Sequence, residues 1–107
     1  MFIHKKGKRE LVVPPEAKSD PQAVEIARVW AAHGGQHVSL DPSLWEDPLA
    51  WGIVLVDLAR HVANALEKLK GKSKREVLER IREGFDAEWS NPTDEAKGYI
   101  IGGEGDA

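Results

Sequence analysis

The chain has no cysteine among its 107 residues. That absence excludes disulfides, thiolate zinc sites, iron–sulfur clusters and cysteine nucleophiles. A long apolar run is also missing, because the longest uncharged stretch of the hydrophobic middle, residues 48–56, is far shorter than the ~20 residues that span a bilayer. No apolar signal-peptide segment follows Met1, since Lys5 and Lys6 come almost at once. We therefore expect a cytoplasmic protein with no membrane partner.

The composition is that of one compact domain. Hydrophobic residues make up 41% of the chain and charged residues 31%, and the length matches the usual size of a domain. We expect residues 1–107 to form a single domain, with a loose basic arm over residues 1–10 and a frayed acidic tail over residues 103–107.

Charge is distributed unevenly around a formal net charge of −3. Residues 68–82 are rich in lysine and arginine, whereas the chain from Glu83 onward is acidic. Interspersed charge is typical of a solvated helix face, and the negative net charge makes nucleic acid an unfavourable partner. Binding of an anionic polymer through residues 68–82 stays open, as does pairing between the basic and acidic segments within one chain or across a dimer.

Three helices are predicted, at about residues 20–33, 48–70 and 74–89. Asp20-Pro21 and Asp47-Pro48 each combine an N-cap aspartate with a proline at the first helical position. Ser73 begins a capping box. Gly-Gly at residues 34–35 and a single glycine at residue 71 end the first two helices.

The middle helix is expected to be the centre of the fold. Residues 52–56 are apolar all the way round, which indicates cover on more than one side. Gly52 costs about 1 kcal/mol relative to alanine inside a helix, so we expect another backbone to pack closely against it. Trp30 and Trp89 fall on the apolar stripes of the first and third helices and are expected in the core.

Short strands complete the pattern. Residues 36–40 alternate between polar and apolar side chains, and residues 98–102 form a second strand-like segment. Residues 2–13 could form a hairpin or an arm that ends at Pro14-Pro15. These elements predict an α+β fold, a small antiparallel or mixed sheet of short strands covered on one face by three helices. The last strand should pair near residues 38–40.

Metal and cofactor sites are not indicated. The histidines lack the spacing of a metal-ligand set; they are His4, His33, His37 and His61. No glycine-rich phosphate loop is present. We therefore expect neither a metal nor a cofactor.

Asp57, Arg60 and His61 are weak catalytic candidates on the polar side of the middle helix. An aspartate one turn away would orient the His61 ring, as a general base requires. The same residues are equally typical of a half-exposed helix face. No serine, threonine or lysine nucleophile accompanies them.

Trp45 and Trp51 flank the start of the middle helix and should share a corner. They could staple the entry of that helix. Alternatively, they form an exposed anchor for another protein or a second copy, because tryptophan is enriched in interface hot spots. This corner is the predicted partner-binding site.

Several segments together resemble a known family. They are residues 12–15, 37–40, 45–48 (Trp-Glu-Asp-Pro), 51–52, 57–63 (Asp-Leu-Ala-Arg-His-Val-Ala) and 88–94. The chain is similar over about residues 11–98 to small uncharacterised bacterial proteins, domain-of-unknown-function family 5076. The resemblance implies a compact single domain with no assigned activity, cofactor or partner, and no catalytic residue is carried over from it.

Three functions remain open at this point. The first is a non-enzymatic interaction module that forms a homodimer or binds another protein through an apolar helix face or through the corner of Trp45 and Trp51. The second is a small-molecule or catalytic site at Asp57, Arg60 and His61. The third is the binding of an anionic polymer through residues 68–82.

Overall fold

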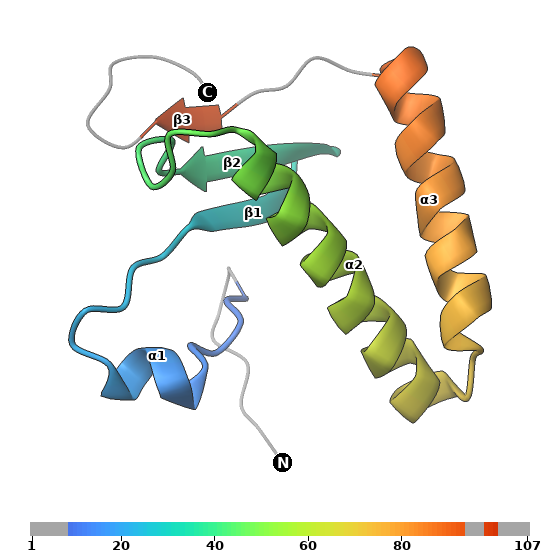
Figure 1. Cartoon of the computed structure of the whole chain (residues 1–107), viewed down its shortest axis with the longest axis horizontal. Helices are drawn as coiled ribbons and strands as arrows, with labels where there is room; N and C mark the ends of the chain where they lie inside the picture. The colour runs from blue at the N-terminus through green and yellow to red at the C-terminus, as the bar shows by residue number, and fades with distance from the viewer. Residues whose placement is uncertain (1–8, 94–97, 101–107) are drawn as a thin grey trace.

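The computed structural model describes residues 9–93 and 98–100. It has an α+β fold of short strands and two long helices (Figure 1). In chain order, the elements are α1 Pro15–Ser19, β1 Ala27–Ala32, β2 Gly35–Leu40, α2 Leu49–Lys70, α3 Lys74–Ser90 and β3 Gly98–Ile100. The predicted α+β class is confirmed.

The sheet is mixed, with the strand order β1-β2-β3. β1 and β2 form an antiparallel hairpin whose register runs from Ala27↔Leu40 to Ala32↔Gly35. β3 pairs in parallel with β2, from Val38↔Gly98 to Leu40↔Ile100. The prediction that the last strand pairs near residues 38–40 is confirmed, and residues 101–102 of that prediction lie outside the described residues.

A two-residue turn joins β1 to β2. Its residues, His33 and Gly34, both have positive φ values of 51° and 73°. Two successive left-handed residues are the mark of the type I′ turn, whose twist matches that of the flanking strands. Glycine adopts this conformation freely, whereas histidine does so at a cost.

The predicted helix at residues 20–33 is wrong, because the Asp-Pro signal forms a turn there. Asp20 Oδ1 accepts a hydrogen bond from the Gln22 amide at 2.8 Å, and the Ala23 amide donates to the Asp20 carbonyl at 3.1 Å. Pro21 therefore occupies the second position of a β-turn, where its fixed φ is favourable. The chain then enters β1 instead of continuing as a helix.

The second Asp-Pro pair makes the same local bonds and does open a helix. Asp47 Oδ1 accepts from the Leu49 amide at 3.0 Å, and the Ala50 amide donates to the Asp47 carbonyl at 3.1 Å. α2 then runs to Gly71, which has a φ of 66° and donates its amide to the Glu67 carbonyl. The predicted helix at residues 48–70 is confirmed.

α3 also begins as predicted. Ser73 Oγ accepts a hydrogen bond from the Glu76 amide at 3.3 Å, a cap that typically stabilises a helix by about 1 kcal/mol. The helix at residues 74–89 is thereby confirmed.

The segment before the sheet differs from the expected strand-like arm. No strand includes any of residues 9–14, and Leu11 is 97% exposed. Pro15 opens the one-turn helix α1, as proline at the first helical position can. The remainder of the predicted arm, residues 2–8, lies outside the described residues.

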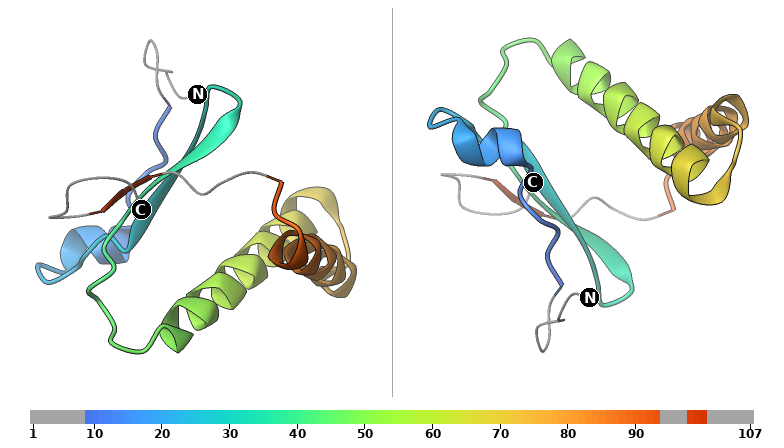
Figure 2. Two further views of the ribbon diagram at one scale, coloured as in Figure 1. Left: turned by 90° about the horizontal axis from the view of Figure 1, so that it is seen from above. Right: turned by 90° about the horizontal axis from the view of Figure 1, so that it is seen from below.

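The helices pack on each other and not on the sheet. α2 and α3 form an antiparallel hairpin on one side of the molecule, and the strands lie on the other (Figure 2). Among the described elements no helix contacts the sheet, so the expected cover of one sheet face by three helices is not observed. The segment of residues 41–48 leads α2 away from the strands.

Very little of this chain is buried. Ala63, on α2, is 1% exposed and is the one buried side chain in the described part of the chain. The chain exposes 10010 Å², whereas a compact monomer of its mass exposes about 5,900 Å². The described part of a single copy therefore has almost no hydrophobic core.

Three expectations about the core are corrected by this burial. Trp89 is 78% exposed, because the last turns of α3 extend beyond its contact with α2. Trp30 is half-buried and lies on β1 instead of a helix. A Cβ atom added to Gly52 would meet nothing within 4 Å, so the expected close backbone is not supplied by the described part of this chain.

Candidate functional site

α2 presents two adjacent apolar faces, of which the first packs against α3. Its most buried residues beyond the first turns are Ala59, Ala63 and Leu66, spaced four and three residues apart. On α3, the half-buried residues are Val77, Leu78 and Ile81. Since α3 is the one element that contacts α2 among those described, it accounts for the burial of this face.

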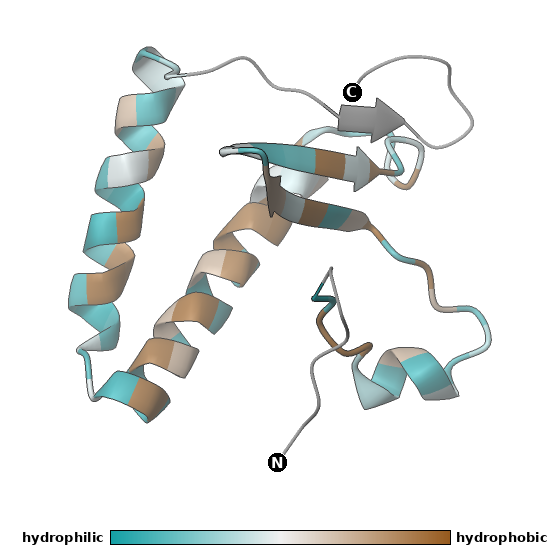
Figure 3. Ribbon diagram, turned by 180° about the vertical axis from the view of Figure 1, so that it is seen from behind, coloured by the Kyte–Doolittle hydropathy of each residue, from teal (hydrophilic) through white to brown (hydrophobic). Residues whose placement is uncertain are grey.

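The second apolar face of α2 is open to solvent. It is a stripe spaced four, three, four, three and four residues apart, and we call it the α2 stripe: Trp51, Leu55, Leu58, Val62, Ala65 and Leu69. Leu58 is 56% exposed and Leu69 is 79% exposed. Figure 3 shows apolar residues along the length of α2. A contiguous exposed apolar surface of this kind typically marks an interaction site.

The face of α2 opposite the stripe is apolar in its first half, where Ile53 and Val56 are 55% and 50% exposed, and polar from Asp57 onward. Asp57, Arg60 and His61 all lie on it and are exposed. In the described residues, no hydrogen bond or ion pair joins any two of the three, and neither of the two hollows described below includes them. The geometry is that of the solvated side of an amphipathic helix.

α2 is also long and apolar enough to cross a membrane by length and composition. Its most apolar window has a mean hydropathy of 1.3, and 6% of that window is buried. The polar face would, however, place Asp57 and Arg60 near the middle of the bilayer, at a cost of about 2.5–3.5 kcal/mol for each charge.

Trp45 and Trp51 form the predicted corner. Their ring centroids lie 5.3 Å apart at an interplanar angle of 80°, an edge-to-face contact. Trp45 is 36% exposed and Trp51 is half-buried. The contact fastens the segment before α2 to its first turn, and partner binding by this corner stays a prediction.

A double-mutant cycle on Trp45 and Trp51 should show favourable coupling. Replacing each tryptophan with leucine, singly and together, removes the edge-to-face contact, which is worth about 0.5–1.5 kcal/mol beyond area burial. The free energies of unfolding of the four proteins, measured by urea denaturation, give the coupling. Strictly additive losses would mean that the two rings do not stabilise each other.

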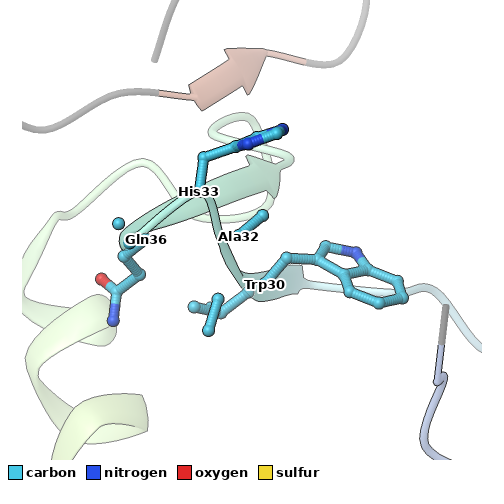
Figure 4. A pocket seen from close by; sticks show the side chains of 8 residues that line it. Trp30, Ala32, His33 and Gln36 are labelled. Carbon is cyan, nitrogen blue, oxygen red and sulfur yellow. The ribbon is translucent and has the colours of Figure 1, made fainter. Parts of the chain in front are cut away.

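Two open hollows lie beside the sheet. One, of about 680 Å³, surrounds the hairpin turn over residues 29–36. In Figure 4, the Trp30 and His33 side chains extend to one side of the hairpin and the Gln36 side chain extends to the other. The other, of about 750 Å³, is lined by residues 9–14, 17 and 23–30. Among the described residues there is no group of three histidine, aspartate or glutamate side chains that could hold a metal ion.

Arg28 lies at the second hollow and forms ion pairs with two carboxylates that line it. Its guanidinium contacts Glu10 at 3.0 Å and Glu25 at 3.1 Å. The hydrogen bond that Arg28 donates to Glu25, reinforced by the charges of both carboxylates, raises the pKa of Arg28. The arginine is therefore engaged in holding the N-terminal segment against β1.

Asp41 forms a turn directly after β2. Its Oδ1 accepts from the Ser43 hydroxyl at 2.6 Å and from the Ser43 amide at 3.0 Å. These hydrogen bonds, the one from the hydroxyl above all, lower the pKa of Asp41. The turn they form starts the segment that separates α2 from the strands.

Basic side chains of residues 68–82 form ion pairs with nearby carboxylates. The pairs are Lys74–Glu67 at 3.5 Å, Arg75–Glu79 at 3.9 Å, Arg80–Glu83 at 3.1 Å and Arg82–Asp86 at 3.1 Å. Acidic side chains thus neutralise much of the positive charge. This pattern is that of a solvated helix surface and gives no support to anionic-polymer binding.

Fold and site together define a small α+β domain whose helical hairpin carries an exposed apolar stripe. The chain belongs to the DUF5076 family, described as a domain of unknown function, and the match covers residues 10–93. The resemblance read from the sequence is therefore confirmed.

A solved structure is similar to this chain over most of both lengths. It is described as "a putative pyruvate dehydrogenase from the photosynthetic bacterium Rhodopseudomonas palustrus CGA009". The two are 37% identical with a TM-score of 0.67, and the match covers 86% of this chain and 94% of that one. The comparison with curated proteins gives no match.

Sequence reasoning expected cover on more than one side of residues 52–56 and did not predict the exposure of the α2 stripe. Periodicity marks a face as apolar without showing what covers it. The available signal was its regular alternation of four-residue and three-residue spacing over residues 51–69, which is typical of helices that pair with helices.

Proposed function

We propose that this protein is a non-enzymatic interaction module that forms a homodimer. The observation that carries the proposal is the α2 stripe, which is apolar over the length of the central helix and exposed. Leu55, Leu58 and Leu69 are each at least half exposed, and covering such side chains is the main favourable term in protein association.

A second copy of the chain supplies the apolar contacts that the described part of one chain lacks. The surface exposed beyond that of a compact monomer is several times the ~800 Å² that each partner contributes to an interface of standard size. Obligate homodimers resemble a domain core cut in half. An identical chain supplies a matching apolar face without requiring any other protein.

A dehydrogenase activity is the alternative that the neighbour's description suggests. Such chemistry relies on a cofactor held in a site with convergent polar groups. The hollows described beside the sheet are open, and Asp57, Arg60 and His61 are exposed on a helix surface. The interaction module is therefore the better-supported function.

Native mass spectrometry of the purified full chain, with sedimentation velocity over a wide range of concentration, tests the proposal. We expect a dimer of the 11.8 kDa chain that carries no additional mass and dissociates on dilution. A monomer carrying a discrete adduct would contradict the proposal. The mass of the adduct would then identify a ligand class, with Asp57, Arg60 and His61 as the first residues to substitute.

A further inference from the structure

We propose that two copies pair through antiparallel packing of their α2 stripes about a two-fold axis near residue 60, so that two α2–α3 hairpins form a four-helix bundle. This inference rests on the proposed homodimer and specifies its surface and geometry. The occupant of the open face of α2 is thus α2 of a second copy.

The spacing of the α2 stripe supports helix-to-helix pairing. Alternation of four and three residues gives an average period of 3.5, the repeat that keeps one apolar seam facing a partner helix. In an antiparallel pair centred near residue 60, Leu58 meets Val62 of the second copy. Leu55 meets Ala65, and Trp51 meets Leu69. Each leucine of the middle of the stripe thereby gains an apolar neighbour.

The two adjacent faces of α2 match the environment of a helix in a four-helix bundle. Such a helix packs against two neighbours through two faces that lie side by side. α3 covers the face that includes Ala63, which is 1% exposed, while Val62 on the adjoining stripe is 42% exposed. One neighbour is therefore present within the chain, and the second neighbour is missing.

Charge favours the antiparallel orientation. Glu46 and Asp47 directly precede α2, whereas Lys68 and Lys70 lie in its last turn and Lys72 follows it. Antiparallel packing places the acidic start of one helix beside the basic end of the other. Parallel packing would bring like charges together at both ends, and it would also align the two helix dipoles unfavourably.

The end of α3 offers further apolar surface to the same bundle. Phe85 and Trp89 stack with ring centroids 5.6 Å apart, and they are 45% and 78% exposed. They lie on the helix that flanks α2, toward the end at which the hairpin is open. In the proposed bundle, the hairpin of a second copy packs at this end and covers both rings, which the described part of one chain leaves exposed.

Cysteine cross-linking tests the pairing, because the native chain contains no cysteine. The variants Leu55→Cys and Ala65→Cys are made in the full chain with tags of different size, mixed, unfolded and refolded together under reduction, and then mildly oxidised. In the antiparallel pair, residue 55 faces residue 65 of the other copy, within the reach of a disulfide. Two copies of residue 55 would lie about 15 Å apart along the axis, too far to bridge.

We expect a covalent dimer in the mixture and almost none with either variant alone. Asn64→Cys mixed with Leu55→Cys is the matched control, because Asn64 lies on the polar face and should not cross-link. Self-linking by Leu55→Cys alone would overturn the antiparallel geometry in favour of a parallel one.

Two further outcomes separate this inference from the proposed function. Absence of any cross-link in a protein that still sediments as a dimer would overturn the α2 pairing and leave the homodimer standing. A monomer that floats with vesicles of phosphatidylcholine and phosphatidylglycerol would overturn both, and would identify a membrane surface as the cover of the stripe. Circular dichroism of each cysteine variant verifies that its helices remain intact.

Discussion

Leu58→Asp is expected to weaken the dimer by at least about 1,000-fold, which corresponds to about 4 kcal/mol. Leu58 lies next to the centre of the α2 stripe and is 56% exposed in one copy. In the proposed dimer, the substitution buries a carboxylate with no partner among apolar side chains, which costs several kcal/mol. The dissociation constant, measured by sedimentation equilibrium, is the readout.

The polar face of the same helix provides the control. Asn64→Asp introduces the same charge on the side of α2 opposite the stripe, and it should leave the dissociation constant nearly unchanged. Leu58→Met keeps the apolar volume and should cost less than about 1.5 kcal/mol. Equal dimerisation by the Leu58→Asp and Asn64→Asp variants would show that the stripe is not the interface.

Gly34→Val should destabilise the protein by about 2–3 kcal/mol through the hairpin turn. Gly34 has a φ of 73°, a left-handed conformation that costs an ordinary residue about 1–2 kcal/mol and a β-branched residue more. A Cβ atom at this position would meet nothing within 4 Å. The loss therefore comes from backbone conformation and not from a clash.

Substitution of the preceding residue, His33, should change the free energy of unfolding in the opposite direction. His33 holds a φ of 51°, so His33→Gly relieves the strain of a left-handed histidine and should stabilise the protein by up to about 1 kcal/mol. Both changes are read from the free energy of unfolding in urea at one protein concentration. A stabilised Gly34→Val variant would be incompatible with the type I′ turn.

The comparison of the two Asp-Pro pairs shows what local signals can and cannot predict. Asp20 and Asp47 make the same bonds to the amide two residues later, at 2.8 Å and 3.0 Å. The first leads into a strand and the second into a helix, because the residues that follow and the availability of β2 as a pairing partner decide the outcome. A capping signal therefore predicted α2 correctly and failed at β1.

Hairpin chemistry offered a signal for β1 that helical spacing obscured. His33-Gly34 separates two segments of strand length, although asparagine and aspartate are the usual residues before the glycine of such turns. The alanines of residues 27, 31 and 32 fit a helix as readily as a strand. Only the pairing of β1 with β2 distinguishes the two possibilities.

The candidate site was predictable in its parts but not in its exposure. The corner formed by Trp45 and Trp51 follows from their spacing across a helix start, and the structure brings the two rings into contact. The polar placement of Asp57, Arg60 and His61 likewise follows from helical periodicity. The exposure of the α2 stripe depends on which other surfaces the chain buries, and no local pattern contains that information.

The parallel pairing of β3 with β2 has a consequence for the order of folding. The β1–β2 hairpin and the α2–α3 hairpin each join segments that are adjacent in the chain, so both can form quickly. β3 can dock only after the whole stretch between Leu40 and Gly98 has been closed into a loop. We expect the two hairpins to be protected from hydrogen exchange early during refolding, with protection of β3 as the last and slowest step.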